Sequence, residues 1–293
     1  MSDPTARRLD VSHAGYYADP CATPSLNAST AKTLITRSPL HAWHEHPRLG
    51  GAPREATTAQ EHGSLIHRLV LGAGDDLEVI DAPDWRTKAA KEQRAEARTA
   101  GRIPVLTADY AEANIVARSI AITLESFGID LSSGEAGESE VMLEWRERSA
   151  RGPVLCRGML DRLSVSRSAA IIYDLKTTPN AHPQACARRV ADLGYDIQAA
   201  AYTSAVEKLR PDLVGRVEFV FVFAETEPPY CVTPMKPGGM MREFGLTRWQ
   251  RAVEVWAACL ADNRWPAYVE SVTQLELPPW VMAADIEFSE SMR

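Results

Sequence analysis

The sequence predicts an α/β fold in which a central mixed β-sheet is flanked by helices. Apolar runs with the alternation or continuity of strands lie at 140–145, 155–165, 169–176 and 216–224. Stretches with apolar residues at helical spacing lie at 58–71, 195–209 and 244–263. Strands and amphipathic helices interspersed along one chain are typical of a sheet covered by helices.

We expect these elements to form one domain over residues 25–293, preceded by an irregular lead-in at 1–24. The first part, 25–130, is predicted to be helical, and the second part, 138–293, to carry the sheet and the helices that follow it. A chain of 293 residues supplies ample material for one large core.

Composition is that of an ordinary globular protein, with 45% hydrophobic and 24% charged residues. No apolar run is long enough to span a membrane, and the first residues have no apolar signal core, so we expect a cytoplasmic protein. The net charge of −7 argues against a surface that is positive throughout. It leaves DNA binding open, since phosphate contacts need only a local basic lining.

Two acids, Asp161 and Asp174, sit in consecutive predicted strands that only a short polar link separates, which favours an antiparallel hairpin. Because strand side chains alternate between faces, Asp174 and Lys176 project the same way. Mg²⁺ and other hard cations bind carboxylate and backbone oxygens, so both acids and the Leu175 carbonyl are candidate ligands. An acid followed by lysine is often only a solvated ion pair, but two acids in apolar strands favour a metal site.

The helix predicted at 195–209 places Gln198 and Tyr202 one turn apart on one face. Gln198 would position the attacking water or a phosphate, and the Tyr202 hydroxyl would contact phosphate or its ring a base. Without Gln198 beside it, Tyr202 would be read as a half-buried core residue. His67 borders the apolar stripe of the helix at 58–71, where a histidine alone is more often structural than a ligand.

Asp161 and the run Asp174-Leu175-Lys176 resemble the D…(D/E)-x-K core of the restriction-endonuclease-like nucleases. The longer pattern resembles the exonuclease VIII (RecE-type) nuclease domain of the PD-(D/E)XK superfamily and, more distantly, the AddB and Cas4 nuclease domains. It comprises His67, Asp161, Asp174, Lys176, Gln198 and Tyr202. The segments CRGMLDRL, IIYDLKTT and YDIQAAAYTSA carry most of the resemblance, which extends more weakly from about Ser25 to Trp280.

The resemblance implies a restriction-endonuclease-like core that binds Mg²⁺ or Mn²⁺ through Asp161, Asp174 and the Leu175 carbonyl, with His67 ligating or nearby. It implies a 5′-to-3′ exonuclease that acts on double-stranded DNA ends and exposes single-stranded tails for an annealing partner in phage-type recombination. It also implies a homo-oligomeric ring around DNA. The N-terminal helix resembles one that touches a DNA end, which makes candidates of Ser29, Lys32 and Arg37. Plain capping and a solvated face explain the same three residues.

A second set of candidate DNA contacts lies on the charged helix predicted at 85–102, whose basic residues share one face. These are Lys88, Lys91, Arg94, Arg98 and Arg102. These basic residues would either face DNA phosphate or lie on a solvated helix face, where i,i+4 pairs with glutamates would neutralise their charge. Glu140 or Glu144 would add a carboxylate to the site, although a solvated strand face is the simpler interpretation of both.

Two other functions compete with the exonuclease hypothesis. An endonuclease or nickase would use the same catalytic core, and a closed circular substrate separates it from an end-dependent enzyme. A catalytically silent DNA-binding module would keep DNA affinity without cleavage. Chemically competent residues at all six positions of the pattern disfavour the silent module.

Overall fold

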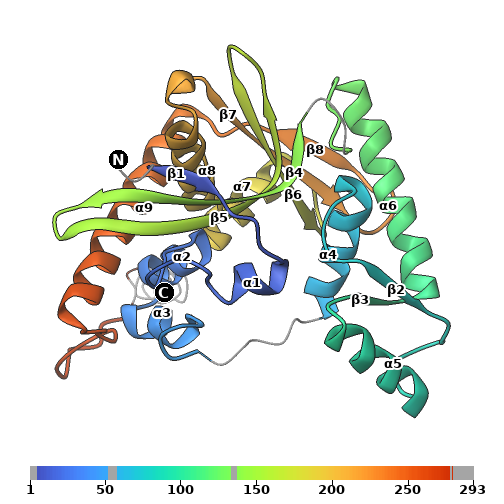
Figure 1. The fold of residues 1–293 in the computed structure, drawn as a ribbon, viewed down its shortest axis with the longest axis horizontal. Helices are drawn as coiled ribbons and strands as arrows, with labels where there is room; N and C mark the ends of the chain where they lie inside the picture. Colours follow the sequence, from blue (N-terminus) through green and yellow to red (C-terminus); the bar gives the residue numbers. More distant parts are fainter. Residues whose placement is uncertain (1–4, 52–57, 133–136, 278, 280–293) are drawn as a thin grey trace, which may run out of the picture.

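A six-stranded mixed β-sheet lies at the centre of the computed structural model, which describes residues 5–51, 58–132, 137–277 and 279 (Figure 1). The strand order is β1-β4-β5-β6-β7-β8, and every neighbouring pair is antiparallel except β6 and β7. This sheet and the helices around it confirm the predicted restriction-endonuclease-like α/β fold.

The strands of this sheet are β1 (Ala6–Arg8), β4 (Glu138–Ser149), β5 (Gly152–Val165), β6 (Ala170–Thr178), β7 (Val217–Glu225) and β8 (Val232–Met235). A separate parallel pair consists of β2 (Leu77–Ile80) and β3 (Ile103–Leu106). The helices before the β4–β6 region are α1 (His13–Tyr17), α2 (Ala28–Thr36), α3 (Pro39–Glu45), α4 (Thr58–Leu71), α5 (Lys88–Thr99) and α6 (Thr107–Ser126). Those after it are α7 (Pro183–Leu193), α8 (Tyr195–Leu209) and α9 (Gly239–Asp262).

Helices pack on both faces of the sheet and bury two hydrophobic clusters. The larger cluster joins one face to α2, α8 and α9 through residues such as Leu34, Ala201 and Trp256. The other cluster joins the opposite face to α4 and α6 through Ile66 and Ile120. Strand alternation explains the division, because consecutive side chains of β6 and β7 enter opposite clusters.

The predicted catalytic hairpin is present as β5 and β6, joined by a turn at 166–169. Ser166 closes this turn, since its hydroxyl accepts hydrogen bonds from the backbone N–H groups of Ser168 and Ala169. The helix predicted at 195–209 is α8, with the same bounds. Gly194 precedes it with a φ of 66°, a left-handed conformation that ends α7 and allows α8 to begin at once.

Two predictions for the N-terminal half were wrong in part. The lead-in at 1–24 is not irregular throughout, because it contains α1 and the edge strand β1, which pairs with β4. β1 has no apolar run, and the local sequence pattern cannot predict its pairing with a strand that is distant in the sequence. The part at 25–130 is not purely helical either, since β2 and β3 form a small sheet beside α5 (Figure 1). The single-domain assignment for 25–293 stays a prediction.

Candidate active site

Asp161 and Asp174 lie where the ladder between β5 and β6 ends. The last paired residues are Arg162 and Tyr173. The two acids are the next residues beyond that pair, Asp161 on β5 and Asp174 on β6. Beyond that point the Leu175 N–H donates to Asp161 Oδ2 at 2.7 Å instead of to a backbone carbonyl of β5. The carboxylate of Asp161 thus takes the place of a ladder acceptor, and the hairpin brings both predicted acids to one place.

Asp174 is fully buried and carries two polar contacts from its surroundings. Lys176 Nζ lies 2.6 Å from Asp174 Oδ2, as expected for two residues on the same face of β6. Gln198 Nε2, from α8, donates to Asp174 Oδ1 at 2.8 Å. The structure therefore joins three predicted site residues directly, and the amide of Gln198 holds the carboxylate in place.

His67 reaches the site from α4, on the other side of Asp161. Its Nδ1 lies 3.6 Å from Asp161 Oδ2, and the backbone of Leu175 is close enough to affect the pKa of the imidazole. Gly63, one turn earlier, faces β6, and a Cβ there would make an ordinary contact, 3.7 Å from Thr177 Oγ1. The predicted histidine, both acids and the Leu175 backbone are thereby neighbours.

Burial dominates the protonation behaviour of these groups. It raises the pKa of Asp161 and of Asp174 to about 6, against the opposing charge of Lys176. Burial also lowers the pKa of His67 to about 4, and the Lys176 charge lowers it further. Burial disfavours the charge on Lys176, yet the two carboxylates raise its pKa above the ordinary value. The buried Asp174 and the half-buried Asp161 thus share one cation, the Lys176 ammonium.

The donor set fits a hard divalent cation. Two carboxylates with one ammonium leave net negative charge in a buried place, and carboxylate and carbonyl oxygens are the ligands Mg²⁺ prefers. Within the described residues, no group of three or more His, Cys, Asp and Glu side chains is arranged to hold a metal. The candidate site has two carboxylates, and its third oxygen ligand would be a backbone carbonyl, that of Leu175. Asp174 is paired with Lys176 in this structure.

Tyr202 lies deeper than the sequence suggested. Its side chain belongs to the larger hydrophobic cluster, and the residue is 7% exposed. The ring covers Gly158, where a Cβ would lie 2.7 Å from Tyr202 Cε1. Burial raises the pKa of Tyr202 well above its ordinary value, and Gln198, one turn earlier on α8, opposes that rise. This position favours a role through Gln198 over stacking on a base.

Tyr195 is a site neighbour that sequence reasoning missed. Its ring lies under the ammonium of Lys176, with 4.9 Å between Nζ and the ring centroid. The signal was present, because Tyr195 precedes Gln198 by three residues and so shares its helix face.

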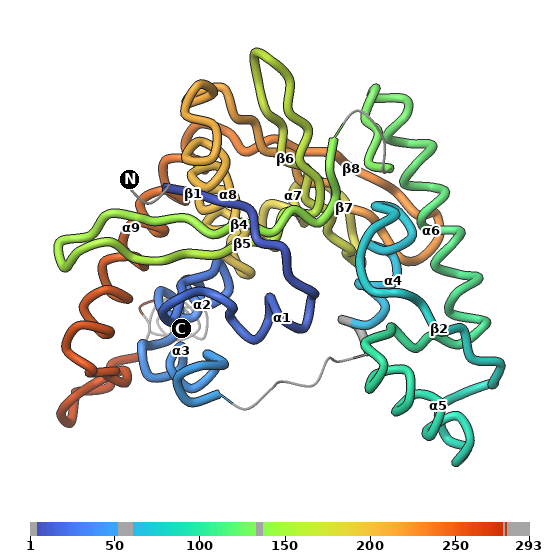
Figure 2. Tube along the Cα trace, in the orientation of Figure 1, coloured from blue at the N-terminus to red at the C-terminus, as the bar shows by residue number. Residues whose placement is uncertain are grey.

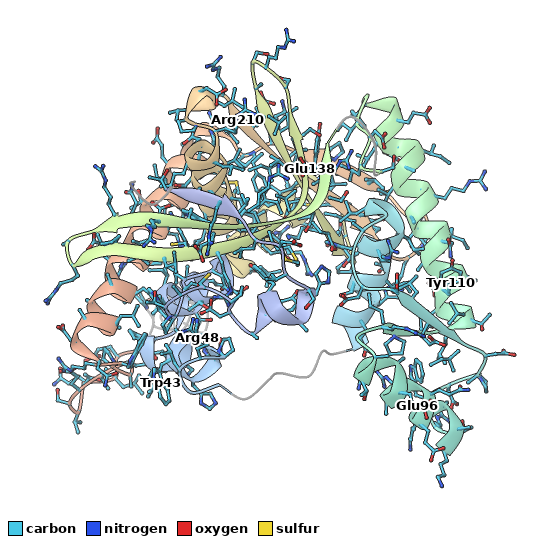
Figure 3. All side chains as sticks on the ribbon, in the orientation of Figure 1. Trp43, Arg48, Glu96, Tyr110, Glu138 and Arg210 are labelled. Carbon is cyan, nitrogen blue, oxygen red and sulfur yellow. The ribbon has the colours of Figure 1, made fainter. Side chains whose placement is uncertain are left out.

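Most of the predicted basic stripe on α5 is engaged in ion pairs. Arg94 and Arg98 both pair with Glu61 of α4. Lys88 lies 3.6 Å from Glu92 on its own helix, whereas Lys91 is exposed. Figure 3 shows that α5, marked by Glu96, lies away from the central sheet.

The candidate DNA contacts of the N-terminal helix lie on or after α2. Ser29 is exposed near its start, where Asn27 supplies the cap by accepting from Thr30 N. The aliphatic stem of Lys32 lies against Gly194, at the start of α8, and Arg37 pairs with Glu45. Lys32 is thus the member of this group that lies next to an element of the site.

Comparison with known proteins places these residues in a family. Residues 29–278 match the model of a family described as a PDDEXK-like domain of unknown function, DUF3799. A solved structure of a candidate exonuclease from Eubacterium rectale has a TM-score of 0.59 at 13% identity and covers 94% of this chain and 98% of its own. This likeness shows a shared fold.

A second solved structure is a phage-related exonuclease from Haemophilus somnus 129PT. It has 11% identity over 82% of this chain and 96% of its own. Its TM-score of 0.32 is too low to establish a shared fold. A comparison of this chain with the curated proteins found no match.

Across the described helices, none combines the length and apolar composition that a membrane span requires.

Proposed function

Because the chain belongs to the PDDEXK-like family DUF3799, and is thus a nuclease of the PD-(D/E)XK type, we propose that it is a divalent-metal-dependent DNA exonuclease. It acts from 5′ to 3′ on linear double-stranded DNA and leaves single-stranded tails for an annealing protein in phage-type recombination. The observation that supports this most is the convergence of five residues of the pattern, from α4, β5, β6 and α8, on one place. The sixth, Tyr202, lies one helical turn from Gln198.

In this proposal Asp161, Asp174 and the Leu175 carbonyl hold Mg²⁺ or Mn²⁺, with His67 beside Asp161. The bound cation would polarise the phosphate and lower the pKa of a bound water. Lys176, kept protonated by the neighbouring carboxylates, supplies positive charge that offsets the charge developing on the phosphate, and it orients the attacking water. A charged group stabilises a transition state more strongly where water is excluded. Lys176 meets this condition, because its side chain is only 15% exposed.

Gln198 and Tyr202 serve the same chemistry from the helix side. Gln198 fixes Asp174 through a 2.8 Å hydrogen bond, which leaves its amide oxygen available to water or phosphate. Tyr202, packed over Gly158 within the core, lies one helical turn from Gln198 on the same face of α8. Both side chains are therefore assigned to placing the reacting groups.

DNA contacts are assigned to basic and polar residues of α2 and α5. The exposed Ser29 and the half-buried Lys32 of α2 are candidates for the DNA end, and Lys88 and Lys91 of α5 for the duplex beyond it. Arg37, Lys88, Arg94 and Arg98 would have to exchange their carboxylate partners for phosphate. Cytoplasmic location and ring assembly belong to the same proposal.

The test compares linear duplex DNA with a closed circle of the same sequence, in Mg²⁺ or Mn²⁺. Wild type is expected to degrade the linear form, spare the circle, and release a 5′ label before a 3′ label. Asp174→Ala should be inactive on both. Asp212→Ala is the matched control, because Asp212 is an exposed carboxylate whose partner is Arg210.

Other outcomes assign the alternatives. Cleavage or nicking of the closed circle by wild type would establish an endonuclease on the same core. Early release of the 3′ label would reverse the proposed polarity. DNA binding without cleavage in either metal would establish the catalytically silent module, and the exonuclease proposal would be wrong.

A further inference from the structure

A third carboxylate, Glu140, stands opposite Asp161 in the sheet. In the β4–β5 ladder Ser139 pairs with Arg162 and Val141 pairs with Leu160, so the position that faces Asp161 is Glu140. Glu140 and Asp161 are not themselves paired, but each lies between two paired residues of the ladder, so the two positions are neighbours across the strands. Glu140 therefore borders the end of β5 at which the candidate active site lies.

The backbone of Glu140 has a conformation that glutamate seldom adopts. Its φ is +52°, although the neighbouring residues on both sides remain paired in the ladder. Positive φ is uncommon for residues other than glycine and is held in place by surrounding contacts. The carboxylate of Glu140 is therefore placed by a local departure from the strand, which the ladder on either side does not require.

Contacts from two other segments hold this carboxylate. His13 Nε2, from α1, lies 2.5 Å from Glu140 Oε2, and His13 Nδ1 lies 3.3 Å from Asp75 Oδ2. Gly74 has a φ of +107°, and a Cβ there would lie 2.9 Å from Glu140 Oε1. His13 thus ties β4 to the segment that follows α4, the helix of His67. Figure 2 shows α1 between α2 and α4.

The negative charge of Glu140 acts on the site itself. Burial is the main influence on both pKa values: it raises the pKa of Asp161 and lowers the pKa of His67. The Glu140 charge adds to the rise for Asp161 and opposes the lowering for His67. Glu144, on the same strand, differs, because it pairs with Arg7 of the edge strand at 2.9 Å. The two glutamates that the sequence left equivalent are thus distinguished by the structure.

We propose that Glu140, held by His13, is a positioning residue of the cation site. Its carboxylate strengthens divalent-cation binding from outside the direct ligands, by adding negative charge beside Asp161. The inference rests on the proposed function, since it assumes the cation site formed by Asp161 and Asp174. Removing an outer partner of this kind typically lowers metal affinity by roughly 10- to 100-fold.

The test measures Mn²⁺ binding by titration calorimetry on the full chain without DNA. Glu140→Asn and Glu140→Asp form a matched pair, because both replacements tolerate positive φ and they differ in charge. We expect about 10-fold weaker Mn²⁺ binding for Glu140→Asn than for Glu140→Asp. Glu144→Gln should bind like wild type, and thermal melts monitored by circular dichroism confirm that each variant is folded.

The outcomes separate this inference from the proposed function. Equal Mn²⁺ affinity for the two Glu140 variants would show that Glu140 has only a structural role and would overturn the inference. Asp174→Ala should lose Mn²⁺ binding. If it binds as wild type does, or if wild type binds no Mn²⁺, the cation site itself is wrong, and both proposals fail. If Glu140→Asp or Glu140→Asn does not fold, Glu140→Gln against wild type gives the same comparison.

Discussion

Lys176 is the side chain whose loss should separate cleavage from DNA binding. Its ammonium lies 2.6 Å from Asp174 and over the ring of Tyr195. Lys176→Met keeps the aliphatic volume and removes the charge that would offset the transition state. We expect the cleavage rate to fall by roughly 10²- to 10³-fold. DNA affinity, measured by gel shift, should change by less than about 3-fold, because one central ammonium supplies few of the phosphate contacts.

Lys236→Met is the matched control for that variant. Lys236 also pairs with a carboxylate, Glu218, but on the exposed surface of the sheet edge. Its replacement should leave the cleavage rate unchanged. A Lys176→Met protein that cleaves within a few-fold of wild type would remove Lys176 from the proposed chemistry.

Asp19 is a buried acid outside the site whose role is stability. Its carboxylate accepts hydrogen bonds from the Ser25 N–H and hydroxyl, and it lies 3.2 Å from Arg157 Nη1 and 3.3 Å from His46 Nε2. Burial opposes its charge, but His46, Arg157 and Ser25 together lower the pKa of Asp19 from 3.8 to about 2. The charged form is therefore the one that stabilises the fold.

Asp19→Asn tests this with a residue that suits the φ of +63° found there. Lowering the pKa of Asp19 from 3.8 to about 2 corresponds to roughly 2 kcal/mol. Arg157 keeps its hydrogen bonds to Ser25 but loses the Asp19 carboxylate, which adds to the loss. We expect urea unfolding at pH 7 to show a loss of at least about 2 kcal/mol. Because the folded pKa is depressed, the difference from wild type should persist above about pH 4 and shrink as the pH falls toward 2. A constant difference across that range would contradict this assignment.

Among the elements, the β5–β6 hairpin and α8 were predictable because their information is local. Apolar runs, a short polar turn and one helical turn between Gln198 and Tyr202 are all legible along the chain. The edge strand β1 was not predictable, since its three residues are ordered by pairing to β4, more than a hundred residues away. The burial of Tyr202 depends in the same way on Gly158, which lies on another element.

The spacing between β5 and α8 should therefore be sensitive to a single methyl group. A Cβ at Gly158 would lie 2.7 Å from Cε1 of the buried Tyr202 ring and 3.3 Å from Trp145. Gly158→Ala must displace the ring, and with it Gln198, so we expect a loss of about 1–3 kcal/mol in stability and slower cleavage. Thermal melting and the nuclease assay check both effects.

Gly238→Ala is the control for this element. It precedes α9, has an extended φ of −68°, and a Cβ there meets nothing within 4 Å. Melting temperature and cleavage should both stay near wild type. If Gly158→Ala behaves like this control, the packing of α8 on β5 does not position the site.

The whole molecule is acidic, which bears on how it would stay on DNA. With a net charge of −7 and several basic side chains already paired, a single copy offers few free phosphate contacts. A protein that makes few phosphate contacts gains little electrostatic affinity for DNA and so dissociates readily. The ring that the sequence resemblance implies would solve this by enclosing the duplex, so that continued cleavage does not depend on affinity alone.

That hypothesis predicts a multimer that degrades DNA processively. Light scattering should give a mass of several chains, and labelled duplexes should be degraded to completion while an excess of unlabelled duplex is added after binding. Raising the salt should slow initial binding more than continued degradation, because enclosure holds the enzyme where charge does not. A monomeric mass together with cleavage that stops when the unlabelled duplex is added would show a distributive enzyme. In that case the acidic chain would have to rebind a DNA end after each round of cleavage.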